Sequence, residues 1–165
     1  MPSSRYFFAV WPPAASAGAL ECWAKNLAGR VTPAAKIHLT LAFLGAVAPE
    51  QAIGAARRVV GRPHALPIER AQYWKHNKIL WAGPREVPLP LKALVESLHL
   101  ELYREEFILE SRPYAAHVTL ARSAPPPREL PPLPRVEWPV GEFTLVRSVN
   151  SARGSVYEIV ERFPL

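Results

Sequence analysis

The chain has 165 residues and carries a net charge of +6, with a sequence pI of about 9.8. Hydrophobic residues make up 49% of the chain and charged residues 21%, which supports a folded core and excludes a generally disordered protein. The single cysteine, Cys22, excludes a disulfide within the chain and favours a reducing compartment.

The positive charge favours an anionic partner, such as nucleic acid or a nucleotide. The apolar run at residues 6–11 is too short to span a membrane. No basic region followed by a long apolar stretch and a cleavage site is visible. We therefore expect a cytoplasmic monomer that does not contact a membrane.

Four elements are predicted in the first part of the chain, where proline and glycine mark the boundaries. Pro12 ends the first strand, Gly29 the first helix and Gly45 the second strand. In chain order these elements are a strand over 5–11, a helix over 14–29, a strand over 37–44 and a helix over about 49–60.

The second part of the chain continues with a hairpin and further strands. The expected elements are a hairpin over 66–83, a helix over about 90–105, a strand beginning at 107–109, a strand over 116–121 and two strands over about 140–149 and 155–162. The proline-rich segment 125–135 is interpreted as a stiff connection between strands.

This order of elements predicts an α+β fold with antiparallel sheets. Each half runs from a helix into a strand that contains His-x-Thr-Leu, which suggests an internal duplication. We expect one domain over 1–165, built as two interlocked lobes with flanking helices in a pseudo-two-fold arrangement around a central cleft.

The sharpest motif is HLTL at residues 38–41, which is echoed by HVTL at residues 117–120. Five histidines and four threonines give about 0.12 His-x-Thr pairs by chance in a chain of this length. In a strand, residues two apart point to the same face. Each motif therefore offers an imidazole and a hydroxyl to one side and apolar residues to the other.

Two imidazoles and two hydroxyls in one cleft suit the hydrolysis of a cyclic phosphodiester. Neutral imidazole and imidazolium serve as base and acid near pH 7, because the ordinary pKa of histidine is about 6.5. The hydroxyls of Thr40 and Thr119 can donate hydrogen bonds to the non-bridging phosphate oxygens.

Two simpler interpretations of the same residues stay open. His38 and His117 are, in the first, half-buried strand residues satisfied by backbone groups. In the second they bind a metal, although no cysteine or carboxylate stands at ligand spacing beside them. We expect no metal and no cofactor.

Beyond the two motifs, most of the chain resembles the two-histidine phosphoesterase superfamily. It is most similar to the branch of RNA 2′,3′-cyclic phosphodiesterases first named 2′-5′ RNA ligases. The similar segments are RYFFAVWPP at 5–13, KIHLTLAFLG at 36–45, ILWAGP at 79–84, RPYAAHVTLAR at 112–122 and SVYEIVERFPL at 155–165.

The resemblance implies a bilobal fold without a metal and opening of a 2′,3′-cyclic phosphate to a 2′-phosphate. It implies that His38 and His117 are the acid–base pair and that Thr40 and Thr119 hold the phosphate. We expect His117 to be the base and His38 the acid. The chain departs from the family where relatives often carry proline, since it has alanine at 115 and 116.

Supporting residues follow from their place beside the motifs. Arg122 resembles a phosphate-binding arginine of the family, although a regular strand would point it away from His117 unless the strand ends or bulges. Phe43 is expected in the core, with stacking on a base as the alternative. The aromatic and basic tip at 73–78 resembles a surface for single-stranded RNA, but ordinary hairpin packing is the interpretation we favour.

The resemblance predicts a hydrolase that acts on RNA ends or on cyclic nucleotides. Joining of RNA ends through a 2′-5′ bond, the reverse reaction, uses the same groups and stays open. A module that binds RNA or a nucleotide without catalysis is a further alternative. Such a module would tolerate His→Ala with a modest loss of affinity, whereas a catalyst would not.

Overall fold

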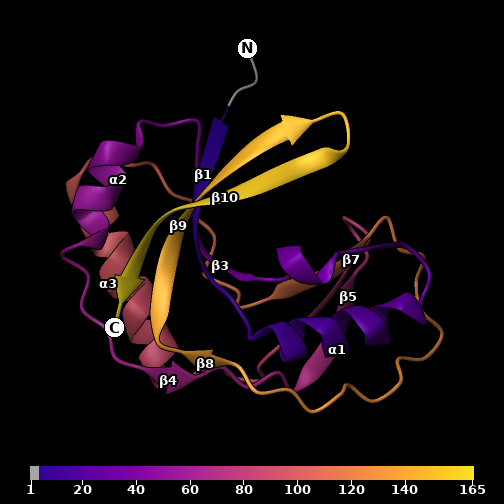
Figure 1. Cartoon of the computed structure of the whole chain (residues 1–165). Helices are drawn as coiled ribbons and strands as arrows, with labels where there is room; N and C mark the ends of the chain where they lie inside the picture. Colours follow the sequence, from indigo (N-terminus) through magenta and orange to yellow (C-terminus); the bar gives the residue numbers. More distant parts are fainter. Residues whose placement is uncertain (1–3) are drawn as a thin grey trace.

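The computed structural model describes residues 4–165 as an α+β fold with three α-helices (Figure 1). The helices are α1 (Ala14–Lys25), α2 (Pro49–Ala56) and α3 (Leu89–Arg104), with a short 3-10 turn η1 (Ala34–Lys36). The strands are β1 (Ser4–Val10), β2 (Arg30–Val31), β3 (Leu39–Gly45), β4 (His64–Ala65), β5 (Arg70–Trp74), β6 (Ile79–Gly83), β7 (Val118–Arg122), β8 (Pro139–Val140), β9 (Glu142–Ser151) and β10 (Gly154–Pro164).

Two four-stranded antiparallel sheets form the two lobes. The first has the strand order β10-β9-β1-β3 and the second the order β2-β7-β6-β5. A small sheet of β4 and β8 lies apart from them. The first His-x-Thr motif leads into β3 of the first sheet, and the second leads into β7 of the second sheet. The predicted α+β class with antiparallel sheets is confirmed.

The helices α1 and α3 each pack against one sheet, while the motif strand that follows them in the chain belongs to the other. The helix α1 precedes β3 but contacts β7 and β2 of the second sheet. The helix α3 precedes β7 but contacts β3 of the first sheet, together with α2 (Figure 1). Each sheet also takes strands from both halves of the chain, so neither sheet is formed by one continuous segment.

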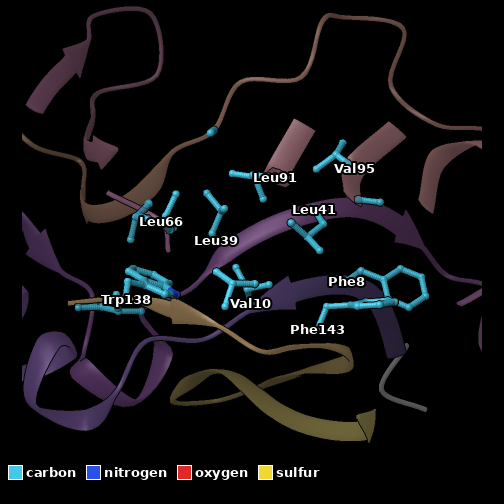
Figure 2. Packing of buried hydrophobic residues seen from close by; sticks show 14 of the residues in the cluster. Phe8, Val10, Leu39, Leu41, Leu66, Leu91, Val95, Trp138 and Phe143 are labelled. Carbon is cyan, nitrogen blue, oxygen red and sulfur yellow. The ribbon is translucent and has the colours of Figure 1, made fainter. Parts of the chain in front are cut away.

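The core is one buried cluster that extends through both lobes, and its larger part in the first lobe lies between the first sheet and the helices α2 and α3. One face of β1 supplies Phe8 and Val10, and β3 supplies Leu39 and Leu41 (Figure 2). The predicted apolar side of the third helix is buried against them, at Leu91, Leu94, Val95, Leu98 and Leu102. A separate small cluster, made of Phe7, Ala9 and Val146 with Trp11 and Tyr157 packed against it, lies on the other face of the same sheet.

Several predicted boundaries are wrong at the helix ends. The first helix ends at Lys25 rather than at Gly29. Directly after Lys25, the side chain of Asn26 donates to the carbonyl of Cys22 (3.3 Å), and the next backbone amides donate to the carbonyl three residues earlier and not four. The second ends at Ala56 rather than near residue 60, because the amides of Arg58 and Val59 donate to the carbonyl three residues earlier and not four, as a continuing α-helix requires.

The strand predicted to begin at residues 107–109 is wrong as well. The helix α3 ends in a left-handed turn with Glu106 at φ 64°, and the Phe107 amide donates to the Leu102 carbonyl (3.0 Å). The chain then runs without a strand partner up to β7. Among residues 4–165, no helix has the length and apolar character that spanning a membrane requires.

Candidate active site

All five predicted site residues line one cleft. It has a volume of about 710 Å³ and takes its walls from both sheets, where β3 and β7 lie side by side. His38 and Thr40 reach it from the first sheet, and His117, Thr119 and Arg122 reach it from the second. The expectation that the duplicated motifs meet in one cleft agrees with this geometry.

The two histidines are anchored by the same local hydrogen bond. Nδ1 of His38 lies 2.7 Å from the carbonyl oxygen of Lys36, and Nδ1 of His117 lies 2.9 Å from that of Ala115. A carbonyl oxygen only accepts hydrogen bonds, so each Nδ1 carries the proton. In the neutral ring, Nε2 is therefore the free base, and in His38 it lies 3.1 Å from the hydroxyl of Thr40.

Aromatic rings enclose His38 on several sides. Its ring stacks on Phe7 (5.0 Å between centroids), approaches Trp11 (5.1 Å) and meets Tyr157 edge-on (5.5 Å). This burial lowers the pKa of His38 to about 4, the hydrogen bond to Lys36 opposes the shift, and the charges of Arg122 and His117 add to it. The free protein therefore holds His38 in its neutral form at pH 7.

His117 has a more open environment. Its anchoring hydrogen bond is exposed to solvent, whereas that of His38 is partly buried. Trp74 (4.7 Å) and Trp81 (6.2 Å) flank the ring. The segment before it runs close to β6, since a Cβ on Gly83 would lie 2.7 Å from the Ala116 oxygen. Glycine at position 83 thus permits the backbone path that aims His117 into the cleft.

A β-bulge follows the threonine in each motif. Thr119 pairs with Trp81 and Ala121 with Leu80, which leaves Leu120 as the extra residue in β7. Two consecutive residues then point into the core, and Arg122 returns to the face of His117. The bulge is why Arg122 reaches the cleft although it lies an odd number of residues after the histidine.

A β-bulge in β3 likewise changes the side to which Phe43 points. Thr40 pairs with Ala9 and Ala42 with Phe8, so that Leu41 is the extra residue. Phe43 therefore turns to the cleft, where 55% of it is exposed. The prediction that it packs in the core is wrong, because regular alternation does not survive the bulge.

The two bulges use different partners for their carbonyl groups. In β3 the hydroxyl of Tyr114 donates to the Thr40 oxygen (2.8 Å), and Nε2 of His99 lies 2.9 Å from the Leu41 oxygen. In β7 the Leu120 oxygen accepts from the Thr32 amide (2.8 Å). Tyr114 stands three residues before His117, so its hydroxyl ties the approach to one motif to the backbone of the other.

A second hollow of about 400 Å³ adjoins the cleft and shares Thr40, Phe43 and His117 with it. Trp74 and Tyr114 line its far side. Trp74 thus lines this hollow while it also packs against Trp81 (5.0 Å between centroids), as ordinary hairpin packing predicts, and a surface for single-stranded RNA stays an alternative. Among residues 4–165, no three histidine, cysteine or carboxylate side chains come together as a metal site would require.

The sequence analysis did not find the residues that enclose His38. A signal for two of them exists, since Phe7 and Trp11 recur at the period of two that places strand residues on one face. Residues 5–11 are apolar on both faces of the strand, so this period of two does not stand out in the sequence. No local pattern indicates Tyr157, which reaches the site through the pairing of β9 with β1 and β10.

Comparisons with known proteins give a consistent picture. The sequence profile of a family described as LigT like phosphoesterase matches residues 10–81. The RNA 2′,3′-cyclic phosphodiesterase of Escherichia coli (strain K12) is 33% identical, over 98% of this chain and 96% of its own length.

Solved structures extend this similarity to the fold. The crystal structure of E. coli LigT in apo form has a TM-score of 0.91 and 31% identity, over 99% of this chain and 98% of that one. The structure of E. coli LigT complexed with 3′-AMP has a TM-score of 0.90 and 32% identity, over 100% of this chain and 99% of that one.

Proposed function

Because the chain belongs to the LigT-like phosphoesterase family, we propose that it hydrolyses RNA 2′,3′-cyclic phosphate ends to 2′-phosphates with His38 and His117 as acid and base. One observation carries the proposal. Both rings are fixed through Nδ1 to the carbonyl two residues earlier, so that Nε2 is the basic atom of each neutral ring; Nε2 of His38 accepts from the hydroxyl of Thr40, which is itself a residue of the cleft. A related protein named RNA 2′,3′-cyclic phosphodiesterase supports the choice of substrate.

The reaction removes one proton from the attacking water and adds one proton to the leaving oxygen, O3′. Nε2 of His117 accepts a proton from water, the water oxygen attacks phosphorus, and the bond from phosphorus to O3′ breaks. His38 donates the proton that O3′ takes up, which leaves a 2′-phosphate and a free 3′-hydroxyl. Thr40, Thr119 and Arg122 hold the non-bridging oxygens, whose negative charge grows in the transition state.

The acid role of His38 sets a condition on its protonation. The pKa of His38 is about 4 in the free protein, so the ring is neutral before the substrate arrives. A phosphate bound between the rings is an anion, which raises the pKa of His38 and favours uptake of a proton. The role assignment therefore predicts that substrate binding and protonation of His38 are coupled.

The aromatic residues supply a surface for the terminal nucleoside. Phe43 stands where the cleft and the adjoining hollow meet, and Trp74 faces the hollow. Aromatic side chains bind bases by stacking, with little preference for sequence. A structural neighbour of this chain is a LigT complexed with 3′-AMP, which is in keeping with a nucleotide in this place.

The test uses an RNA oligonucleotide that ends in a 2′,3′-cyclic phosphate, with EDTA present. The wild type is expected to yield only the 2′-phosphate, identified by chromatography against 2′- and 3′-phosphate standards. His38→Ala and His117→Ala should each lose about 10²- to 10⁴-fold in kcat/KM. His64→Gln is the matched control, because Nδ1 of His64 also lies 2.8 Å from the carbonyl two residues earlier, but outside the cleft.

Three results would contradict the proposal. The first is RNA binding without turnover by the wild type, which would indicate a binding module. The second is a 3′-phosphate product, which would mean that the bond from phosphorus to O2′ breaks instead of the bond to O3′. The third is a loss of activity in His64→Gln as large as in the two cleft variants, which would point to a general effect of removing a histidine.

A further inference from the structure

The bulge in β3 is held by side chains, whereas the bulge in β7 is held by the backbone. The extra residue of a bulge leaves the hydrogen-bond ladder of the sheet, so its peptide groups need other partners. In β7 the carbonyl of the extra residue Leu120 accepts from the backbone amide of Thr32 (2.8 Å). In β3 the carbonyl of the extra residue Leu41 lies 2.9 Å from Nε2 of His99, a residue of α3. One side-chain replacement can therefore remove the partner of the bulge in β3 but not of the bulge in β7.

His99 bonds to the backbone through the opposite ring nitrogen from the two histidines of the cleft. A carbonyl oxygen only accepts hydrogen bonds, so Nε2 of His99 carries a proton, whereas His38 and His117 are anchored through Nδ1. His99 does not line the cleft between those two rings. Its Nε2 is thus committed to the backbone of β3 and takes no part in the proposed proton transfer.

The helix segment that carries His99 is anchored in the core. Leu98 and Leu102, on either side of His99 in α3, are fully buried. The ring of Tyr114 lies edge-on to the His99 ring (6.3 Å between centroids), and its hydroxyl donates to the Thr40 carbonyl (2.8 Å). Burial raises the pKa of Tyr114 above its ordinary value, so this donor keeps its proton at neutral pH. Two neighbouring side chains therefore hold two consecutive carbonyl groups of β3.

The bulge in β3 decides which way Phe43 points. Without the extra residue, the alternation of the strand would shift by one position, and each side chain beyond it would change faces. Phe43 would then turn to the core in place of Ala42, which is buried, and Ala42 would turn to the cleft. Because Phe43 stands where the cleft and the adjoining hollow meet, this change would remove an aromatic surface from the site.

We propose that His99 is a positioning residue, whose hydrogen bond to the Leu41 carbonyl keeps the bulge in β3 and thereby keeps Phe43 turned to the substrate. The inference rests on the proposed function, in which Phe43 offers its ring to the terminal nucleoside. It adds a residue of α3 that acts on substrate binding through the backbone of β3. Because the effect passes through Phe43, it belongs to KM rather than to kcat.

The experiment measures steady-state hydrolysis of an RNA oligonucleotide that ends in a 2′,3′-cyclic phosphate. His99→Leu removes the donor and should raise KM about three- to tenfold, with kcat within about threefold of the wild type. His99→Gln should bring KM back to within about twofold of the wild type, because the amide nitrogen of glutamine donates from a similar place. A KM in His99→Gln as high as in His99→Leu would overturn the proposal, since the donor would then have no effect.

His99 also lines the hollow beside the cleft, so a double variant must separate action through Phe43 from a direct contact with the substrate. In a Phe43→Leu background, His99→Leu should raise KM no further, because the ring that it positions is already absent. Additive effects would give His99 a substrate contact of its own and overturn the positioning role.

Ser97→Ala is the matched control on the same helix. It removes another side-chain bond of α3, to the Val60 amide (2.9 Å), and Ser97 lines neither the cleft nor the hollow. It should leave KM unchanged. A rise in KM equal to that of His99→Leu would point to a general loss of packing at α3 and overturn the specific role of His99.

A measurement that needs no catalysis distinguishes this inference from the proposed function. In protein labelled with fluorophenylalanine, the fluorine NMR resonance of Phe43 is the one that disappears in Phe43→Leu. Its shift between H₂O and D₂O reports exposure of the ring and should fall in His99→Leu, but not in His99→Gln or Ser97→Ala. If this result is found but the wild type hydrolyses no RNA, the proposed function fails and the effect of His99 on Phe43 stands. If the wild type hydrolyses RNA and the resonance is unchanged in His99→Leu, the positioning role is overturned and the hydrolase stands.

Discussion

The strands β3 and β7 carry the same backbone geometry but offer different side chains to the cleft. Each follows a histidine held by the carbonyl two residues earlier, and each has one extra residue after its threonine. The bulges turn equivalent positions to the cleft, Phe43 on one side and Arg122 on the other. The duplicated backbone thus positions two imidazoles alike, while the side chains that follow give the two sides of the cleft different surfaces.

The histidines show the same contrast in their surroundings. Three aromatic rings surround His38 and lower its pKa to about 4, whereas the anchoring bond of His117 is open to solvent. In the free protein these surroundings favour the neutral form of His38, so its proposed role as the acid requires that the bound phosphate raises its pKa.

Of the two side chains that the bulges turn to the cleft, Arg122 is expected to give the larger effect when it is replaced. Arg122→Gln should lower kcat/KM about 10²-fold for cyclic mononucleotides and for RNA alike, because in the proposed mechanism the guanidinium group stabilises charge at the reacting phosphate. Steady-state kinetics on both substrates measures this. A loss confined to RNA would assign Arg122 to the rest of the RNA chain instead of the reacting phosphate.

The burial of His38 predicts a loss of folding stability in acid. Its pKa in the folded protein lies below the ordinary 6.5, so between pH 6.5 and 4 the unfolded chain binds a proton that the folded chain does not. The stabilisation is complete above pH 6.5 and disappears as the pH falls towards 4. We expect a loss of about 2 kcal/mol from this residue between pH 7.5 and pH 5.

Urea unfolding of the wild type and of His38→Gln at these two pH values measures the effect. The variant should lose less stability on acidification, since glutamine does not titrate. Arg62→Gln should keep the pH dependence of the wild type. An equal loss in the wild type and His38→Gln would mean that His38 titrates alike in the folded and unfolded chain.

Replacing Phe43, the side chain that the β3 bulge turns to the cleft, should affect binding rather than chemistry. Phe43→Leu removes an aromatic surface that is 55% exposed, and stacking on one base contributes about 1–3 kcal/mol. We expect KM to rise about tenfold with kcat within about threefold. Phe43→Trp should restore binding, because it keeps the stacking surface. A fall in kcat as large as that of Arg122→Gln would remove the distinction between the two sides.

The smallest effect is expected at the link between the motifs. Tyr114→Phe removes the hydroxyl that donates to the Thr40 oxygen and should cost about 1 kcal/mol in the free energy of unfolding. Because this oxygen belongs to the β3 bulge, kcat should also fall a few-fold. Tyr103→Phe is the control, since Tyr103 is 53% exposed on α3. Equal stability of the two variants would show that the hydroxyl does not support the bulge.

The amino-acid pattern predicts the motif strands well because it depends only on local alternation. His38 and Thr40 share a face by the period of two, as do His117 and Thr119, and the structure places all four at one cleft. The apolar spacing also predicts the third helix to within a residue at each end. Such features follow from backbone geometry that is the same in every protein.

Features that depend on distant partners could not be predicted in this way. The bulge at Leu120 arises where β7 pairs with β6, and no residue type at that position signals it. The surroundings of His38 need Tyr157, more than a hundred residues further along the chain. The segment at 107–109 has the composition of a strand but no neighbouring strand to complete its hydrogen bonds.

The pairing of strands that lie far apart in the sequence has a consequence for biosynthesis. The strand β1 pairs with β9, and β7 lies between β2 and β6, so neither sheet is complete until its latest strands have left the ribosome. Partners this far apart in the chain carry a high entropic cost of loop closure and give slow folding. A nascent chain halted before β9 would contain both histidines and all four strands of the second sheet, but only β1 and β3 of the first, whose unpaired strand edge is a surface for chaperones.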